Sequence, residues 1–233
     1  MISSLYLDNT GICCIIVCNI VNTKIFKDNS NHTFVGTSNI YLANLLDIKV
    51  LGTMAHLYIM LNAAIYGYRM ANKMAMDNWV DIYNGDLGTY LPDTFTTDIF
   101  LKSFNKKYAM LFTGVRHDSG DPYLFVDKIV NHYKNLGIDP MEKTIIFSDS
   151  LNPNLACEIK EYCAGKIKSS FGIGTNFTND INVNIKPLNI VIKLSYVLVN
   201  DEWYDIVKLS DSVGKHMGTD DEVKLCKQIL KIK

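Results

Sequence analysis

The sequence has 233 residues, of which 48% are hydrophobic and 20% are charged, and its formal net charge is −1. A chain of this length can bury one sizeable core or two small ones, and its composition is that of an ordinary globular protein. Because the charge is nearly balanced, the sequence excludes a strong overall field of the kind that attracts nucleic acid or an anionic membrane. We expect neither as a partner.

The chain begins with an apolar run, GICCIIVCNIV, over residues 11–21. This run has about half of the ~20 apolar residues that a membrane-spanning helix needs, and no basic segment precedes it, as a secretory signal would require. We expect a buried strand or the edge of an amphipathic helix there. The six cysteines include no paired CxxC set, so the sequence predicts reduced thiols and no zinc site or disulfide framework.

From residue 48 onward, short apolar strands alternate with amphipathic helices. In the first long helix, for example, Leu57, Leu61 and Ile65 recur every four residues. Repeated strand, loop and helix units indicate parallel strands with helical crossovers. The predicted strands are 48–51, 86–91, 144–147 and 167–171, and the predicted helices are 55–83, 96–112, 125–136 and 153–163.

The C-terminal region has a different pattern. Residues 190–199 form a strongly β-prone run, and residues 203–209 can pair with it as a hairpin around Asn200, Asp201 and Glu202. Residues 223–232 then predict a short basic helix with a solvated face. We expect neither element to carry the chemistry.

Polar and glycine-rich clusters follow the predicted strands. Because the carboxyl ends of parallel strands lie at one edge, we expect these clusters to share one face of the molecule. An open doubly wound sheet would also gather them there, but so many carboxylates on successive strand ends favour a β/α barrel. The clusters are GTMAH (52–56), PDTFTTD (92–98), RHDSGD (116–121), SDSLN (148–152) and GIGTNFTND (172–180).

The last of these clusters suits an anionic ligand. Gly172 and Gly174 can take positive φ angles and allow a ligand to approach the main chain. Successive N–H groups, including that of Thr175, would then form an anion nest that could hold a sugar phosphate. The alternative is a plain turn.

The cluster RHDSGD combines one cation with two carboxylates. Arg116 offers a planar fork for a carboxylate or a phosphate. Asp118 and Asp121 lie in one turn and suit sugar hydroxyls or the outer shell of Mg²⁺. Alternatively, Asp121 caps the following helix, and the two roles are compatible. We expect His117 to be a loop residue.

The chain carries a series of motifs in a fixed order: FVGTSN (34–39), GTMAH (52–56), LPDTFTTDIFLKSF (91–104), GVRHDSGDP (114–122), FSDSLN (147–152), SFGIGTNFTND (170–180), PLNIVIKL (187–194) and KLSDSVGK (208–215). In these motifs the sequence resembles the nicotinate phosphoribosyltransferase family from about residue 32 to the C-terminus. The resemblance implies an α/β fold, a partial and irregular β/α barrel of the type II phosphoribosyltransferase kind. This domain would span 32–233, with the hairpin and helix at its C-terminal end. Residues 1–31 are atypical, and family members are longer at the front, so we expect a chain truncated at its N-terminus.

The resemblance also implies a reaction. Nicotinate, phosphoribosyl pyrophosphate and ATP would give nicotinate mononucleotide, pyrophosphate, ADP and phosphate, the first step of NAD salvage from nicotinate. ATP would be a co-substrate and Mg²⁺ the cofactor. The enzyme would be a cytoplasmic homodimer, which in a eukaryote could also enter the nucleus. The alternatives are a catalytically impaired fragment or paralogue that binds phosphorylated ligands or a full-length partner, and a sister enzyme that uses nicotinamide or quinolinate.

By the same resemblance, His56 is the histidine that ATP phosphorylates, and a neutral imidazole nitrogen is a competent nucleophile. Leu57 follows it where the family usually has glutamate, so this position bears on ATP coupling. Asp93, Asp118 and Asp121 are the expected carboxylates near the ribose, with Asp118 and Asp121 also placing Mg²⁺ indirectly. The residues expected to bind substrates are Arg116, Ser119, Gly120, Thr37, Ser38, Gly172, Gly174 and Thr175.

Overall fold

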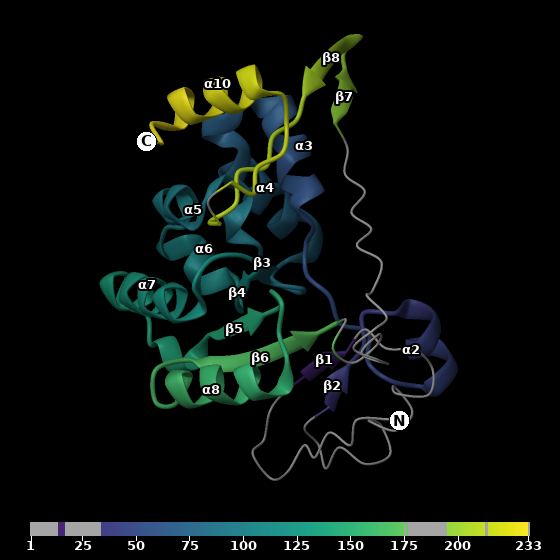
Figure 1. Ribbon diagram of the computed structural model, residues 1–233, viewed down its shortest axis with the longest axis vertical. Coiled ribbons are helices and arrows are strands. Elements are labelled where there is room, and N and C mark those ends of the chain that lie inside the picture. The colour runs from purple at the N-terminus through teal and green to yellow at the C-terminus, as the bar shows by residue number, and fades with distance from the viewer. Residues whose placement is uncertain (1–13, 17–33, 175, 177–194, 213, 233) are drawn as a thin grey trace.

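The fold is described from a computed structural model, which covers residues 14–16, 34–174, 176, 195–212 and 214–232 (Figure 1). The expected boundary between residues 31 and 32 lies outside the described residues. So do the flanks of the first apolar strand and residues 190–194 of the predicted hairpin. None of the helices in the described ranges combines the length and the apolar character needed to cross a membrane.

A six-stranded sheet with the strand order β2-β1-β6-β5-β4-β3 forms the base of the molecule. Every pairing in it is parallel, which confirms the α/β class with a parallel sheet. The outermost strands β2 and β3 are not paired with each other in the described ranges, so closure into a barrel stays a prediction. The strands are β1 (Cys14–Ile16), β2 (Phe34–Gly36), β3 (Thr89–Tyr90), β4 (Gly114–His117), β5 (Thr144–Phe147) and β6 (Lys168–Ile173).

Helices connect the strands and cover the sheet, and aromatic side chains fill the core between them. The rings of Phe147 and Phe171 stack between neighbouring strands at 5.5 Å, and Tyr90 stacks on Phe100 at 4.6 Å. The helices are α2 (Ile40–Leu46), α3 (His56–Tyr66), α4 (Tyr68–Tyr83), α5 (Thr97–Ser103), α6 (Lys106–Leu111), α7 (Pro122–Asn135), α8 (Pro153–Cys163) and α10 (Asp220–Leu230), with 3-10 turns η1 (Pro92–Phe95) and η2 (Pro140–Glu142).

Two of the predicted helices are each broken in two. The helix predicted over 55–83 stops at Gly67, whose φ of 79° and ψ of 157° end α3 and begin α4. The helix predicted over 96–112 is interrupted before Asn105, whose side chain accepts hydrogen bonds from the N–H groups of Lys107 and Tyr108 and caps α6. The glycine and the capping asparagine therefore end the helices, although the helical spacing of apolar residues continues on the other side of each break.

Two predicted strands are shorter than expected. The strand predicted over 86–91 is reduced to β3. Residues 84–87 form a turn in which Asn84 and Leu87 adopt left-handed φ angles of 51° and 52°. The strand predicted over 48–51 is only a single bridge between Val50 and Thr37. By contrast, β5 and α8 have the predicted bounds.

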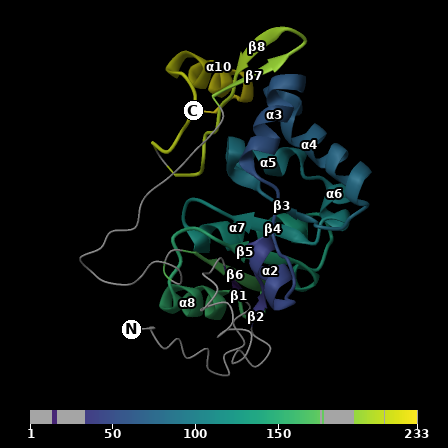
Figure 2. The same ribbon diagram turned by 90° about the vertical axis from the view of Figure 1, so that its right-hand side faces the viewer.

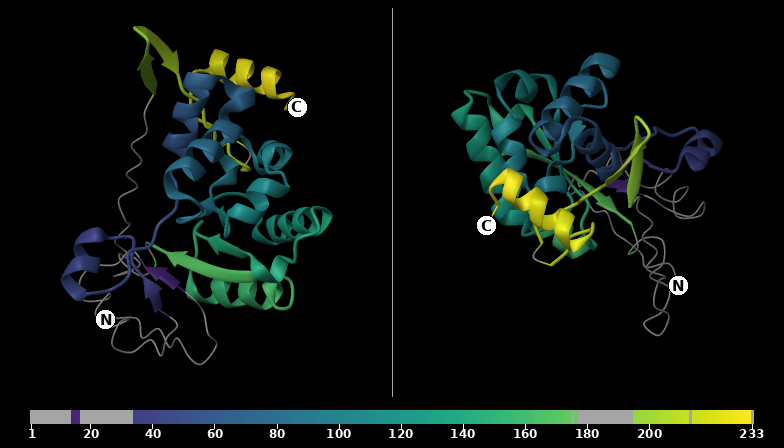
Figure 3. Two further views of the ribbon diagram at one scale, coloured as in Figure 1. Left: turned by 180° about the vertical axis from the view of Figure 1, so that it is seen from behind. Right: turned by 90° about the horizontal axis from the view of Figure 1, so that it is seen from above.

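The C-terminal elements pack at the end of the molecule far from α8 (Figures 2 and 3). β7 (Tyr196–Val199) and β8 (Glu202–Asp205) form an antiparallel hairpin as predicted, but Glu202 belongs to the second strand and that strand ends at Asp205, not at residue 209. α10 is less solvated than predicted, because it buries Val223, Cys226 and Leu230. Between the hairpin and α10 the chain returns toward the sheet, and we call residues 206–212 the C-terminal clasp.

Candidate active site

Strand β4 presents two of the expected residues on one face. Side chains alternate across a strand, so Val115 and His117 are buried in the core while Arg116 lies on the opposite face and is partly exposed. Asp118 follows on the same side as Arg116, and the two side chains meet at 2.6 Å between Nη2 and Oδ1. The parallel sheet places this pair at the carboxyl edge, where the polar clusters are expected to gather.

His56 lies at the centre of the site, at the first turn of α3. Its Nε2 is 3.0 Å from Oδ2 of Asp118 and 3.5 Å from Oδ1 of Asp93, and its Nδ1 is 3.0 Å from Oγ1 of Thr94. The imidazole is only 6% exposed. Because two carboxylates face Nε2, the arrangement favours the proton on Nε2 and leaves the lone pair on Nδ1, which can accept the Thr94 hydroxyl hydrogen.

Asp118 is a carboxylate held by neighbours on every side. Oδ1 accepts hydrogen bonds from Nη2 of Arg116 at 2.6 Å and from Oγ of Ser148 at 2.9 Å, while Oδ2 faces His56. Burial alone would raise the pKa of Asp118, but the His56 hydrogen bond and the Arg116 charge outweigh burial and lower that pKa well below its usual value. The group is therefore an ionised carboxylate across the neutral pH range.

The guanidinium group of Arg116 is held in one orientation by hydrogen bonds. Its Nε donates to Oγ of Ser148 at 2.7 Å and its Nη1 donates to Oγ1 of Thr53 at 3.0 Å. With the bond to Asp118, these contacts hold the guanidinium plane in place while 28% of the side chain stays exposed. The remaining donors of its fork can meet an anionic ligand in the site.

Asp93 is almost completely buried at the start of η1, with its side chain 2% exposed. Its Oδ2 accepts hydrogen bonds from Oγ of Ser119 at 2.6 Å and from Nζ of Lys208 at 3.1 Å. Its Oδ1 faces His56. The structure thus brings His56, Asp93, Arg116 and Asp118 together in direct contact, and Ser119 supports Asp93 from behind.

Several residues that surround these four side chains have no role predicted from the sequence. Thr53, Thr94 and Ser148 all lie in the quoted strand-end clusters, so their position next to a predicted strand was the available signal. Lys208 and Asp211 belong to the motif KLSDSVGK, far along the chain, and no local pattern indicated where they would pack. Asp211 accepts hydrogen bonds from N and Oγ1 of Thr97.

Asp121 and Gly120 lie beside the site. Asp121 is the N-cap of α7, since its Oδ1 accepts from the N–H groups of Tyr123 at 2.8 Å and Leu124 at 2.9 Å, as the capping interpretation predicted. Gly120 has a φ of 85°, and its N–H donates to Oγ of Ser212 at 3.2 Å. Both residues line a cavity of about 440 Å³ between α5, α7 and the C-terminal clasp.

The remaining residues expected to bind substrates are Thr37, Ser38, Gly172, Gly174 and Thr175. Gly172 is inside β6, paired with Ile15, and neither it nor Gly174 has a positive φ angle, so this reason for the two glycines was wrong. Thr175 lies outside the described residues. Thr37 is buried and its Oγ1 accepts from N of Asn39 at 3.2 Å, whereas Ser38 is exposed.

Removing the Asp121 cap provides a test of its structural role. Replacement of Asp121 with alanine should lower the free energy of unfolding by about 1 kcal/mol, because two N–H groups in the first turn of α7 lose their acceptor. The replacement with asparagine keeps an acceptor and should cost much less. Urea denaturation of both variants measures this, and equal losses for the two would contradict the capping role.

His117 is not the loop residue that the sequence predicted. It is the last residue of β4 and is 3% exposed, with its ring against Phe125 at 5.0 Å and Phe147 at 5.7 Å. Burial lowers the pKa of His117, and the opposing charge of Asp149 is too weak to restore it. Alternation along β4 explains the position, because His117 shares the core-facing side of the strand with Val115.

This burial predicts a dependence of stability on pH. The unfolded state takes up a proton on His117 near pH 6.5, while the folded state keeps His117 neutral. The free energy of unfolding is therefore unaffected by this group above about pH 6.5 and decreases as the pH falls below that value. Unfolding free energies measured between pH 8 and pH 5 should fall less steeply for His117→Leu than for the wild type. The exposed His216, changed to glutamine, is the control and should leave the slope unaltered. A His117→Leu slope equal to that of the wild type would contradict the prediction.

Comparison with known proteins identifies the family to which the chain is similar. Residues 17–233 match the model of the nicotinate phosphoribosyltransferase (NAPRTase) family. A nicotinate phosphoribosyltransferase of Desulforapulum autotrophicum is 51% identical over 202 residues, which cover 86% of this chain and 51% of the relative. One from Chromohalobacter salexigens is 47% identical over 205 residues, 88% of this chain and 52% of the relative.

A solved structure gives the same result for the fold. The crystal structure of nicotinate phosphoribosyltransferase from Porphyromonas gingivalis superimposes with a TM-score of 0.93 at 47% identity, covering 96% of this chain and 60% of that chain. The chain spans about half the length of the curated relatives that it matches. By the extent of these matches, the chain belongs to the nicotinate phosphoribosyltransferase family.

Proposed function

We propose that this chain belongs to a protein that carries out the ATP-coupled synthesis of nicotinate mononucleotide from nicotinate and phosphoribosyl pyrophosphate. The observation that supports this most is the histidine with two carboxylates at the carboxyl edge of the parallel sheet. His56, Asp93 and Asp118 have ligand atoms that all lie within 4.8 Å of one another. A cation, Arg116, adjoins them.

The histidine arrangement suits phosphoryl transfer from ATP. With the proton on Nε2 donated to Asp118 and Oδ1 of Asp93 facing the same nitrogen, the lone pair of Nδ1 is the nucleophile. A bond forms between Nδ1 and the γ-phosphorus while the bond from that phosphorus to the oxygen of ADP breaks. The two carboxylates then stabilise the positive charge that develops on the ring, and the Thr94 hydroxyl turns from Nδ1 toward the incoming phosphate.

The second reaction places a positive charge at the anomeric carbon. The bond from that carbon to pyrophosphate breaks as the ring nitrogen of nicotinate attacks, and positioning supplies most of the catalysis. Asp118 would supply negative charge toward the ribose, since His56 and Arg116 keep its carboxylate ionised. The free donors of Arg116 would receive the carboxylate of nicotinate.

Mg²⁺ fits this donor set through water. Oδ1 of Asp93 is buried and accepts no hydrogen bond from the described residues, and Nε2 of His56 lies 3.5 Å from it. The oxygens of Asp118 are engaged by protein donors, which leaves a water-mediated contact, as Mg²⁺ often makes with proteins. Bound Mg²⁺ would neutralise phosphate charge on the substrates. A contact with Asp121 would use Oδ2, because Oδ1 caps α7.

A second candidate is binding of phosphorylated ligands without turnover. The specific observation in its favour is Leu57, which replaces the glutamate that the family resemblance predicts beside His56. Under this candidate the site would bind ATP or phosphoribosyl pyrophosphate, and His56 would carry no phosphate.

The test is to incubate the purified full chain with γ-³²P-labelled ATP and Mg²⁺, then to add nicotinate and phosphoribosyl pyrophosphate. We expect a base-stable, acid-labile phosphate on the protein, its absence in His56→Gln, and formation of nicotinate mononucleotide. Nucleotide binding by calorimetry without label or product would support the second candidate. Absence of label, product and binding would contradict both.

A further inference from the structure

The C-terminal clasp holds the main chain of η1 in place. The N–H of Leu209 donates to the carbonyl of Thr94 at 2.7 Å, and the N–H of Ser210 donates to the carbonyl of Asp93 at 3.1 Å. Ile206, Val207 and Leu209 are buried, so apolar packing anchors the clasp on both sides of Lys208. A segment more than a hundred residues away in the sequence thus fixes the turn that carries Asp93.

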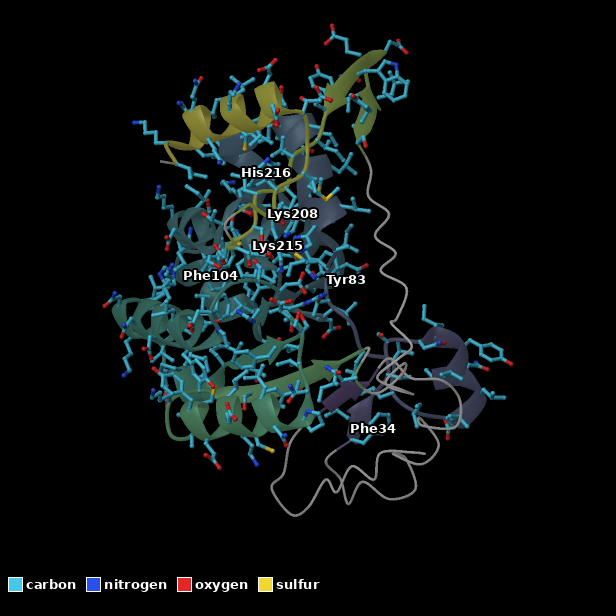
Figure 4. The ribbon with its side chains drawn as sticks, in the orientation of Figure 1. Phe34, Tyr83, Phe104, Lys208, Lys215 and His216 are labelled. Atoms are coloured by element: carbon cyan, nitrogen blue, oxygen red, sulfur yellow. The ribbon has the colours of Figure 1, made fainter. Side chains whose placement is uncertain are left out.

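The clasp also supplies a cation to the buried carboxylate. Lys208 lies in the clasp between α10 and β3 (Figure 4), and its side chain is 12% exposed. Its Nζ contacts Oδ2 of Asp93 at 3.1 Å, and the same oxygen receives the hydroxyl hydrogen of Ser119 at 2.6 Å. Ser119 is itself held by the N–H of Asp211 at 3.1 Å. Both donors from the protein therefore converge on Oδ2, and Oδ1 is turned toward His56.

We propose that Lys208 is a positioning residue: it holds Asp93 so that Oδ1 faces Nε2 of His56. A carboxylate 2% exposed is stable there only with a charged or hydrogen-bonding partner. Without Lys208, the buried carboxylate loses a partner at Oδ2 and rotates toward another donor. That rotation weakens the contact between Oδ1 and the imidazole N–H. Lys208 thus acts on the histidine through Asp93 and need not touch a substrate.

The test compares the full chain with Lys208→Met and Lys208→Arg by ¹⁵N NMR of the imidazole rings, with His56 assigned from His56→Gln and the effect of losing the carboxylate set by Asp93→Asn. We expect the His56 Nε2–H signal of Lys208→Met to move toward that of Asp93→Asn, and that of Lys208→Arg to stay near the wild type. Lys224→Met, which removes an exposed lysine paired with Asp221, is the control and should change nothing. A Lys208→Met spectrum equal to that of the wild type would overturn the proposal.

This first measurement does not depend on the proposed function, whereas a second one rests on it. If the wild type transfers phosphate to His56, Lys208→Met should lower the rate by about 10- to 100-fold, the usual effect of removing an outer partner of a site residue. The KM for ATP should change little, and arginine should restore most of the rate. If Lys208→Met does not fold, Ser119→Ala removes the other donor to the same oxygen and should move the His56 signal in the same direction. An unmoved His56 signal in that variant would also overturn the proposal.

Discussion

Replacing Asp118 with asparagine should lower the rate of phosphoryl transfer to His56 by about 10³- to 10⁴-fold, as when the buried aspartate of a catalytic triad becomes an amide. The reason is the direction of the hydrogen bonds. Oδ1 of Asp118 accepts from Arg116 and Ser148, and Oδ2 faces the N–H of His56. An asparagine has only one acceptor oxygen, which Arg116 would hold, so its NH₂ group would face His56. The imidazole would then have to accept at Nε2 and carry its proton on Nδ1, the nitrogen that must attack.

The imidazole tautomer gives this prediction a readout besides the rate. ¹⁵N NMR should show the Nε2–H form of His56 in the wild type and the Nδ1–H form in Asp118→Asn. Asp86→Asn removes an exposed carboxylate in the turn before β3 and is the matched control, which should leave both the tautomer and the rate unchanged. A His56 that keeps its Nε2–H form in Asp118→Asn would show that Asp118 does not set the tautomer, whatever the rate.

Much of this site could be predicted because strand geometry is local. Arg116 and Asp118 are two residues apart at the end of a strand, so they share a face. The parallel order predicted from the strand and helix alternation puts Asp93 and Asp118 at one edge of the sheet, and His56 was expected there from the family resemblance. In the structure these residues lie within 2.6 Å to 3.5 Å of one another.

The parts that sequence reasoning missed depend on packing between distant segments. Lys208 reaches Asp93 only because the clasp folds back over η1, and no periodicity encodes that return. Gly172 was interpreted as a loop residue because β1, its partner strand, lies far away at the start of the chain. The sequence did not predict the helix breaks at Gly67 and Asn105, because the helical spacing of apolar residues continues across them.

Replacing Gly114 with alanine should destabilise the protein by about 3 kcal/mol or more, at the upper end of what overpacking costs. Gly114 begins β4 and pairs with Thr144 of β5. A Cβ added there would overlap the Thr144 carbonyl oxygen, which belongs to the backbone and cannot move aside like a side chain. β4 would have to separate from β5 at the point from which Arg116 and Asp118 are positioned. We therefore expect a lower urea midpoint and a weakened site together.

Gly52→Ala is the matched control for this change. A Cβ at Gly52 meets no atom within 4 Å, so this substitution should be neutral or stabilise the protein by up to about 1 kcal/mol through the unfolded chain. Gly52 lies just before Thr53, which accepts a hydrogen bond from Arg116, and Gly114 lies two residues before Arg116. Both substitutions are therefore close in sequence to residues that hold the guanidinium. If Gly114→Ala unfolds at the urea concentration of Gly52→Ala, the close approach of β4 and β5 at Thr144 is not a constraint on the fold. If Gly114→Ala is destabilised but its His56 imidazole signals match the wild type, the strand tolerates a local separation without passing it on to Arg116 and Asp118.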